Sequence, residues 1–155
     1  MTTEVGFAPD EIDTSAPTRA ARLKWVIVVN DSLSPGLAVN AASCVSAATS
    51  QHIAGLLGEG VVDLDGSDHP GLPWAGCSVL EADVDSLRVI RAKADAHPET
   101  FVVDMPAAAQ QTRVYDEYRA AVAESSGDAI DYYAVSIVGP RNAVDRIVKR
   151  LSLLG

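Results

Sequence analysis

Apolar residues recur along this chain in two alternating patterns, short β-branched runs and longer stretches with helical spacing. The strand-like runs are Trp25–Val29, Cys77–Ala82, Thr100–Asp104 and Ile130–Val138. The helix-like stretches cover about residues 36–57, 84–96, 106–123 and 142–151. Because buried strands alternate with helices, the pattern predicts an α/β fold: a three-layer α/β/α sandwich around a mostly parallel or mixed sheet of about four main strands.

Capping and turn residues mark the ends of several elements. Ser34, which precedes a proline, is typical of a helix start, and Asp83 is a second N-cap residue. Val61–Leu64 predicts a short edge strand, and the Asp-Gly pair that begins at Asp65 is a turn signal. The helices therefore begin close behind the strands that precede them.

The first part of the chain lacks this periodicity. It combines prolines, acids and hydroxyl side chains, so we expect residues 1–22 to form a disordered or loosely docked tail. Residues 23–155 predict a single domain, because a chain of 155 residues with 48% hydrophobic composition has enough apolar side chains for one core.

Charge and cysteine content limit the partners and the compartment. The formal net charge is −9, and nucleic-acid affinity depends on basic residues that neutralise phosphates, so we expect no nucleic-acid partner. No apolar run approaches the ~18 residues of a membrane span, and the N-terminus does not resemble a signal peptide, which favours a cytoplasmic protein without membrane association. Cys44 and Cys77 are too few for a disulfide framework, and their small or apolar neighbours predict buried thiols.

Polar residues follow several of the predicted strands. In open α/β sheets, ligands bind beyond the carboxyl ends of the strands, and free N–H groups at the following helix starts favour anions. The candidate ligand-binding residues are Asn30, Asp31, Ser32, Asp104, Gly139 and Arg141. Arg141 adds a planar donor for a carboxylate or phosphate. The alternative is local: the polar side chains satisfy loops and helix ends, and Arg141 pairs with an acid.

Motifs of cofactor and metal sites are absent from the sequence. There is no phosphate-binding loop, dinucleotide fingerprint or nucleophile elbow, so we expect no cofactor. His52, His69 and Cys77 have no standard metal-site spacing, and we expect no metal. Trp74 lies in a Pro/Gly-rich loop, and the sequence leaves three roles open for it: an exposed lid, a dimer contact or packing over the core.

Several segments together resemble a known fold family. They are Trp25–Leu33, Ala41–Ala48, the Asp-Gly turn followed by Leu72-Pro73, and Gly139–Asp145. On these motifs the chain from Leu23 to Leu154 is similar to the peptidyl-tRNA hydrolase type II fold. It resembles more closely an uncharacterised bacterial family with that fold, the domain-of-unknown-function family numbered two thousand. The resemblance implies a homodimer, because the fold family tends to dimerise.

The same resemblance argues against peptidyl-tRNA hydrolysis. The hydrolases carry Lys, Gln and His after the first strand and Thr in the last, where this chain has Val39, Ser43, Ser46 and Ala134. Their Asp after the third main strand has no counterpart in register, although Asp104 is close. None of the replacements titrates, so none supplies general acid–base help. A sequence pI of about 4.6 also suits tRNA poorly.

Two functions remain, with a third reading beside them. The first is a small cytoplasmic module that binds a polar or anionic small molecule and works as a homodimer. The second is a hydrolase or transferase with a redesigned site, in which Asp31 or Asp104 is the general base and Ser32 or Ser43 a positioning hydroxyl. That site requires these groups to converge within hydrogen-bond reach in a pocket. The third, docking through the small-residue helix, predicts a large exposed apolar patch on that helix.

Overall fold

The computed structural model describes residues 4–155 and contains a four-stranded mixed sheet. Its strand order is β4-β1-β6-β5, formed by Ser78–Ala82, Leu23–Asn30, Tyr132–Pro140 and Phe101–Pro106. The β1–β4 pairing is parallel, whereas β6 is antiparallel to both of its neighbours. The predicted four main strands are confirmed, and of the two predicted arrangements, mostly parallel or mixed, the sheet has the mixed one.

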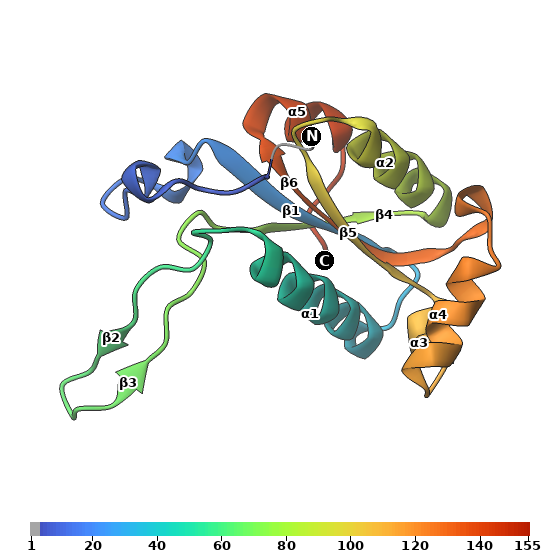
Figure 1. The fold of residues 1–155 in the computed structure, drawn as a ribbon, viewed down its shortest axis with the longest axis horizontal. Coiled ribbons are helices and arrows are strands. Elements are labelled where there is room, and N and C mark those ends of the chain that lie inside the picture. Colours follow the sequence, from blue (N-terminus) through green and yellow to red (C-terminus); the bar gives the residue numbers. More distant parts are fainter. Residues whose placement is uncertain (1–3) are drawn as a thin grey trace.

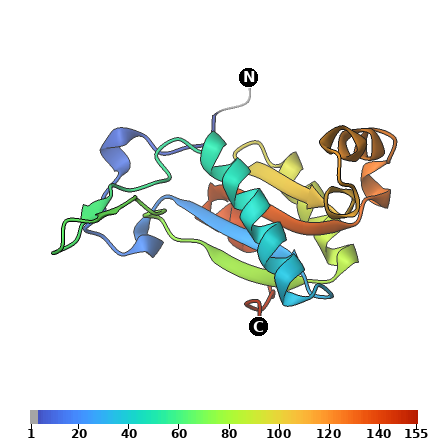
Figure 2. The same ribbon diagram turned by 90° about the horizontal axis from the view of Figure 1, so that it is seen from below.

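Helices cover both faces of this sheet. Helix α1 (Pro35–His52) lies on one face, and α2 (Val84–Ala96) and α5 (Arg141–Ile147) lie on the other (Figure 1). Two short helices, α3 (Ala108–Gln111) and α4 (Tyr115–Ala123), lie beyond the end of the sheet (Figure 2). The predicted three-layer α/β/α sandwich is therefore confirmed.

The position of α3 and α4 explains the direction of β6. A helix that crosses the face of a sheet returns the chain to a parallel strand. Here the chain turns back at the end of the sheet, so β6 runs antiparallel to β5. The sequence predicts one helix over 106–123, but residues 112–114 separate two helices, and Val114, expected on the inner face, is 53% exposed.

Strand β1 separates two apolar cores because successive side chains point to opposite faces. Trp25 and Ile27 pack in the core beneath α1, and Val26 and Val28 pack in the core beneath α2 and α5. The continuous β-branched run thus forms a strand buried on both faces, as the sequence predicts. Asp83 caps α2 by accepting a hydrogen bond from the Ser86 amide, also as predicted.

A directional chain of hydrogen bonds crosses the core beneath α1. Trp25 Nε1 donates to Ser136 Oγ at 2.8 Å, and Ser136 Oγ lies 2.7 Å from Thr49 Oγ1. Thr49 Oγ1 donates to the carbonyl of Val45 at 2.7 Å, so Ser136 is the donor in the middle bond. The chain links β1, β6 and α1 and leaves each of its buried polar side chains with a partner.

Two segments differ from the sequence expectation. Val61–Val62 (β2) is not an edge strand of the main sheet; it pairs with Asp68–His69 (β3) in a separate hairpin that projects from the body (Figure 1). Within residues 4–22, Phe7 is buried, donates its amide to the Ala54 carbonyl at 2.8 Å, and packs on Trp74 with ring centroids 4.8 Å apart.

Phe7 therefore anchors the N-terminal segment to the loop that follows α1 and to Trp74. A single aromatic anchor has no periodicity, which is why the sequence pattern does not reveal it. Residues 1–3 of the predicted tail lie outside the described residues. The reading of Trp74 as a side chain that packs over the core is confirmed.

Candidate functional site

The sheet places the six predicted site residues at two opposite edges. Strands β1 and β5 run in the same direction, so Asn30, Asp31, Ser32 and Asp104 lie toward the edge where β6 begins. Gly139 and Arg141 lie near the opposite edge, where Pro140 pairs with Leu23. Because β6 is antiparallel to β1 and β5, the six residues do not lie together at one end of the sheet.

Gly139 and Arg141 have local structural contacts. A Cβ on Gly139 would lie 2.7 Å from Thr100 Cγ2, so the close approach of these segments requires glycine. Arg141 Nη2 donates to the Ala21 carbonyl at 3.2 Å, which ties the N-terminal segment to the start of α5. The local alternative therefore holds at both positions, although Arg141 binds a carbonyl rather than an acid.

The residues after β1 form a turn. Asn30 Oδ1 accepts hydrogen bonds from the backbone amide and the hydroxyl of Ser32 at 2.9 and 2.6 Å. Asn30 Nδ2 donates to the Tyr132 carbonyl at 3.4 Å, and the Asn30 side chain is buried. Asp31 is exposed. Asn30 and Ser32 thus satisfy the loop rather than present free groups to a ligand.

Asp104 belongs to an ion pair on the α2 side of the sheet. Arg91 Nε donates to Asp104 Oδ2 at 3.1 Å, and the two side chains are 33% and 21% exposed. Burial opposes the charge on Arg91, but the hydrogen bond and charge of Asp104 outweigh it and raise the pKa of Arg91. Asp104 is therefore a paired carboxylate, which makes it a poor general base.

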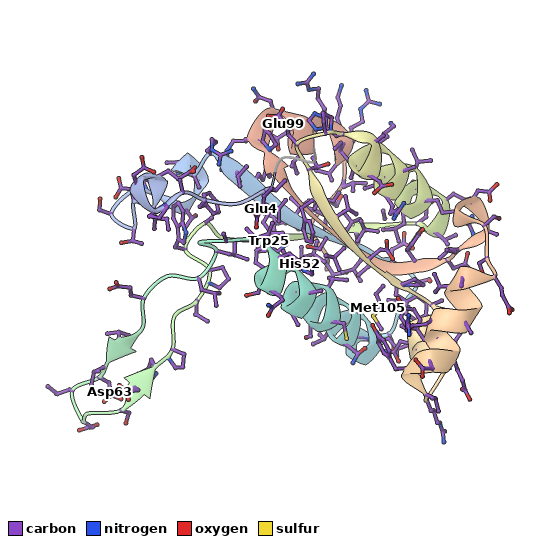
Figure 3. The ribbon with its side chains drawn as sticks, in the orientation of Figure 1. Glu4, Trp25, His52, Asp63, Glu99 and Met105 are labelled. Carbon is purple, nitrogen blue, oxygen red and sulfur yellow. The ribbon has the colours of Figure 1, made fainter. Side chains whose placement is uncertain are left out.

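A hollow of about 700 Å³ lies between α1, the end of β5 and the α3–α4 pair. We call it the α1–α4 pocket. Its apolar lining includes Val45 and Met105, both buried, with Ala48, Val103 and Ala109. Figure 3 shows Met105 at this end of the sheet, away from Trp25 and His52. The pocket lies at the carboxyl-end edge where ligands bind in open α/β sheets, and of the six predicted residues it includes Asp104.

Polar groups surround the mouth of the α1–α4 pocket. The side-chain amide of Gln110 donates to Asn40 Oδ1, which bridges α3 and α1. The rings of Tyr115 and Tyr118 meet edge to face, with centroids 5.4 Å apart. Burial, and then the charge of Asp104, raise the pKa of Tyr118, so its phenol stays protonated at neutral pH and can donate a hydrogen bond. The guanidinium of Arg113 adds a cation.

The catalytic arrangement proposed from the sequence does not form. Ser43 Oγ donates to the Val39 carbonyl within α1, Ser32 Oγ bonds to Asn30, and Asp104 pairs with Arg91. None of these groups bonds to another. The four positions of the hydrolase pattern give the same result: Ser46 Oγ also bonds within α1, and Ala134 is fully buried.

Both cysteines are exposed, so the expectation of buried thiols is wrong. Cys44 lines the α1–α4 pocket, where its sulfur lies 3.9 Å from Asn40 Oδ1. Within residues 4–155 no three His, Cys, Asp or Glu side chains cluster as metal ligands. In the same range, no helix combines the length and the apolar character needed to cross a bilayer.

Of the residues predicted from the sequence, Asp104 lines the α1–α4 pocket, and the other pocket residues were not predicted. Asn40 and Cys44 stand in a small-residue helix, and nothing in their spacing marks them. The polar run Gln110–Arg113 inside an otherwise apolar helical pattern is the one available signal, because such a break favours a change of direction.

Comparison with known proteins identifies the family. Residues 23–155 match the model of a family described as a protein of unknown function, DUF2000. The chain belongs to this family. A solved structure of a protein of unknown function from Agrobacterium tumefaciens strain C58 is similar, with a TM-score of 0.72 at 19% identity over 86% of this chain and 98% of that chain. At this identity the likeness establishes the fold alone. No curated protein matches the chain.

Proposed function

We propose that this DUF2000 domain binds a small anionic molecule with an apolar or aromatic body in the α1–α4 pocket. Two properties of the pocket support this. Its floor is apolar, which favours a hydrophobic body, and its mouth carries amides, phenols and a guanidinium, which favour a polar or anionic head.

The observation that carries the proposal is the state of Arg113. Arg113 is exposed at the pocket mouth, and among residues 4–155 it forms no ion pair. Arg22, Arg88, Arg91 and Arg119 all pair with carboxylates. An un-neutralised guanidinium presents several donors in a plane that suits a carboxylate, sulfonate or phosphate. In a chain of net charge −9, such a local cation offsets the general repulsion of anions.

The pocket lining favours binding over catalysis. Its thiol is Cys44, and no histidine lines the pocket to activate that thiol or a hydroxyl group. Its carboxylate, Asp104, is paired with Arg91. Nucleophilic and general-base mechanisms need an activated nucleophile or a base within hydrogen-bond reach, and neither arrangement is present among these residues.

The test compares two fluorescent probes that share an aromatic body. Anilinonaphthalene sulfonate carries an anionic head, and phenylnaphthylamine lacks one. Arg113→Gln should weaken binding of the sulfonate about five- to tenfold, the usual effect of losing one partly exposed charge-assisted hydrogen bond. It should leave the neutral probe unchanged. Arg119→Gln is the matched control, because Arg119 is exposed on α4 and pairs only with Asp116.

Each result decides the assignment. Selective loss of sulfonate binding in Arg113→Gln supports the anion site. Equal affinities in the parent chain and both variants place the dye elsewhere and refute the proposal. Equal losses of both probes in Arg113→Gln also refute it, because a damaged pocket, rather than a missing cation, then explains the change.

A further inference from the structure

The β2–β3 hairpin and its base form an arm, residues 57–72, that extends away from the sandwich (Figure 1). Every residue from 59 to 70 is exposed. The exposed fraction is 67% for Val61, 59% for Val62, 102% for Leu64 and 78% for Leu72. Figure 3 shows Asp63 far from the other labelled residues. The arm therefore presents a series of large apolar side chains that are mostly exposed to solvent.

The arm is braced at its base. The Gly58 amide donates to the Leu72 carbonyl at 2.8 Å, and Leu57 pairs with Pro73. A Cβ on Gly71 would lie 1.8 Å from the Gly58 carbonyl oxygen, so the two strands approach as closely as they do only because residue 71 is glycine. A two-stranded hairpin is at best marginally stable alone in water, and exposed apolar patches mark interaction sites. We therefore expect the exposed apolar side chains of the arm to pack against a partner surface.

The charge of the arm specifies that surface. Residues 57–72 include four acids, Glu59, Asp63, Asp65 and Asp68, and no Lys or Arg. Asp63 is used within the hairpin: its carboxylate accepts the amides of Asp65 and Ser67 and lies 3.1 Å from His69 Nε2. Asp65 and Asp68 form no ion pair among the described residues. Asp68 stands opposite Val62 in the strand register, so an acid and an apolar side chain share one face.

The C-terminal strip, residues 146–155, has the opposite charge. It carries Arg146, Lys149 and Arg150 and no acid. Leu153 and Leu154 are 68% and 39% exposed. The strip is fixed along the free edge of β4, where Glu81 and Leu154 donate their amides to the carbonyls of Ser152 and Val79, each at 3.0 Å. It is an ordered surface that combines bases with exposed leucines.

We propose that the arm of one copy of this chain docks on the C-terminal strip of a second copy, reciprocally about a two-fold axis. Asp65 and Asp68 of the arm face the bases of the strip, and the exposed Val62 and Leu64 meet Leu153 and Leu154. Because each copy has a net charge of −9, the remainder of the partner repels an acidic arm, and a strip that carries bases and no acid is a favourable place for it. A closed two-fold dimer uses both arms and both strips. This interface is independent of the pocket function proposed above.

Sedimentation equilibrium of the full chain tests the interface. The parent chain should sediment at micromolar concentration with twice its 16.2 kDa mass. Leu64→Ser, and separately Asp65→Lys with Asp68→Lys, should raise the dimer dissociation constant at least about tenfold, as loss of a central contact does. Glu99→Lys with Glu124→Lys is the matched control, because it changes the net charge equally at exposed positions outside both surfaces and should leave the dimer intact.

Charge reversal on the partner surface makes the test specific. On its own, the double change Arg146→Glu with Lys149→Glu should dissociate the dimer. Combined with Asp65→Lys and Asp68→Lys in the same chain, it should restore the dimer. Unchanged far-UV circular dichroism and a cooperative unfolding transition confirm that each variant folds; the midpoint itself should fall when the dimer dissociates, because association stabilises the folded state. A monomeric parent chain overturns the proposal. A dimer that survives the arm changes, or paired reversals that do not restore association, also overturn it.

Discussion

The buried hydrogen-bond chain beneath α1 leads to a quantitative prediction about stability. Ser136 is 1% exposed, and its hydroxyl accepts from Trp25 Nε1 at 2.8 Å while donating to Thr49 Oγ1. Ser136→Ala removes that hydroxyl. Thr49 keeps its bond to Val45, but the indole N–H of Trp25, a side chain only 7% exposed, loses its acceptor.

The expected loss combines two contributions. A buried donor left without an acceptor costs about 1–3 kcal/mol, and a lost hydrogen bond contributes about 1 kcal/mol. Ser136→Ala should therefore lower the free energy of unfolding by about 2–4 kcal/mol. In a Trp25→Phe background no indole donor is left, so the same change should cost only about 1 kcal/mol, and the coupling energy should be about 1–3 kcal/mol.

Urea unfolding followed by circular dichroism measures all four members of this cycle. The midpoints should shift while the denaturant slope stays constant, because the surface exposed on unfolding hardly changes. Thr49→Ser is the matched control, since it keeps the hydroxyl and should cost less than Thr49→Val. A Ser136→Ala effect that is equal in both backgrounds would refute the reasoning, because the indole would then not depend on Ser136.

Two further predictions concern the N-cap of α2 and the N-terminal segment. Asp83→Ala should lower the unfolding midpoint by a few degrees, whereas Asp83→Asn keeps a capping oxygen and should not. Hydrogen bonds from Ser86 hold the pKa of Asp83 below its usual 3.8. The carboxylate therefore contributes its full stabilisation above pH 3.8, and this contribution declines as the pH falls through the lowered pKa. A difference in unfolding midpoint between the parent chain and Asp83→Ala that stays constant at acid pH would contradict this. Phe7→Ala should speed tryptic cleavage at Arg19 and Arg22 at least about tenfold, because the N-terminal segment loses its buried anchor. The control Pro9→Ala changes an exposed residue and should leave the cleavage rate unchanged. Equal cleavage rates in the parent chain and Phe7→Ala would contradict the role of Phe7 as an anchor.

Local patterns in the sequence predict the elements well because their causes are local. The continuous apolar run of β1 requires burial on both faces. The carboxylate of Asp83 accepts a hydrogen bond from the amide of Ser86, three residues further along the chain. These features depend on residues adjacent in the chain. The same holds for the four main strands and for the start of α1 at Pro35.

The direction of β6 depends on contacts that local patterns do not reveal, and it separates the predicted site residues into two groups. Whether α3 and α4 cross the sheet or stand at its end depends on packing between distant residues, such as the Gln110–Asn40 amide contact. Once β6 is antiparallel, Arg141 lies at the wrong edge, and Arg113 becomes the cation nearest the carboxyl-end pocket. The projecting arm was missed for a similar reason, since Val61–Val62 has the composition of any edge strand.

Protection of Cys44 tests the proposed pocket most directly. In a Cys77→Ser variant, Cys44 is the one remaining cysteine of the chain, and it lines the α1–α4 pocket. With anilinonaphthalene sulfonate at about ten times its dissociation constant, alkylation of Cys44 by iodoacetamide should slow roughly tenfold by mass action. In the Arg113→Gln variant, the same dye concentration should slow alkylation of Cys44 less. A rate of alkylation that stays unchanged while the dye is bound would contradict a ligand site in the α1–α4 pocket.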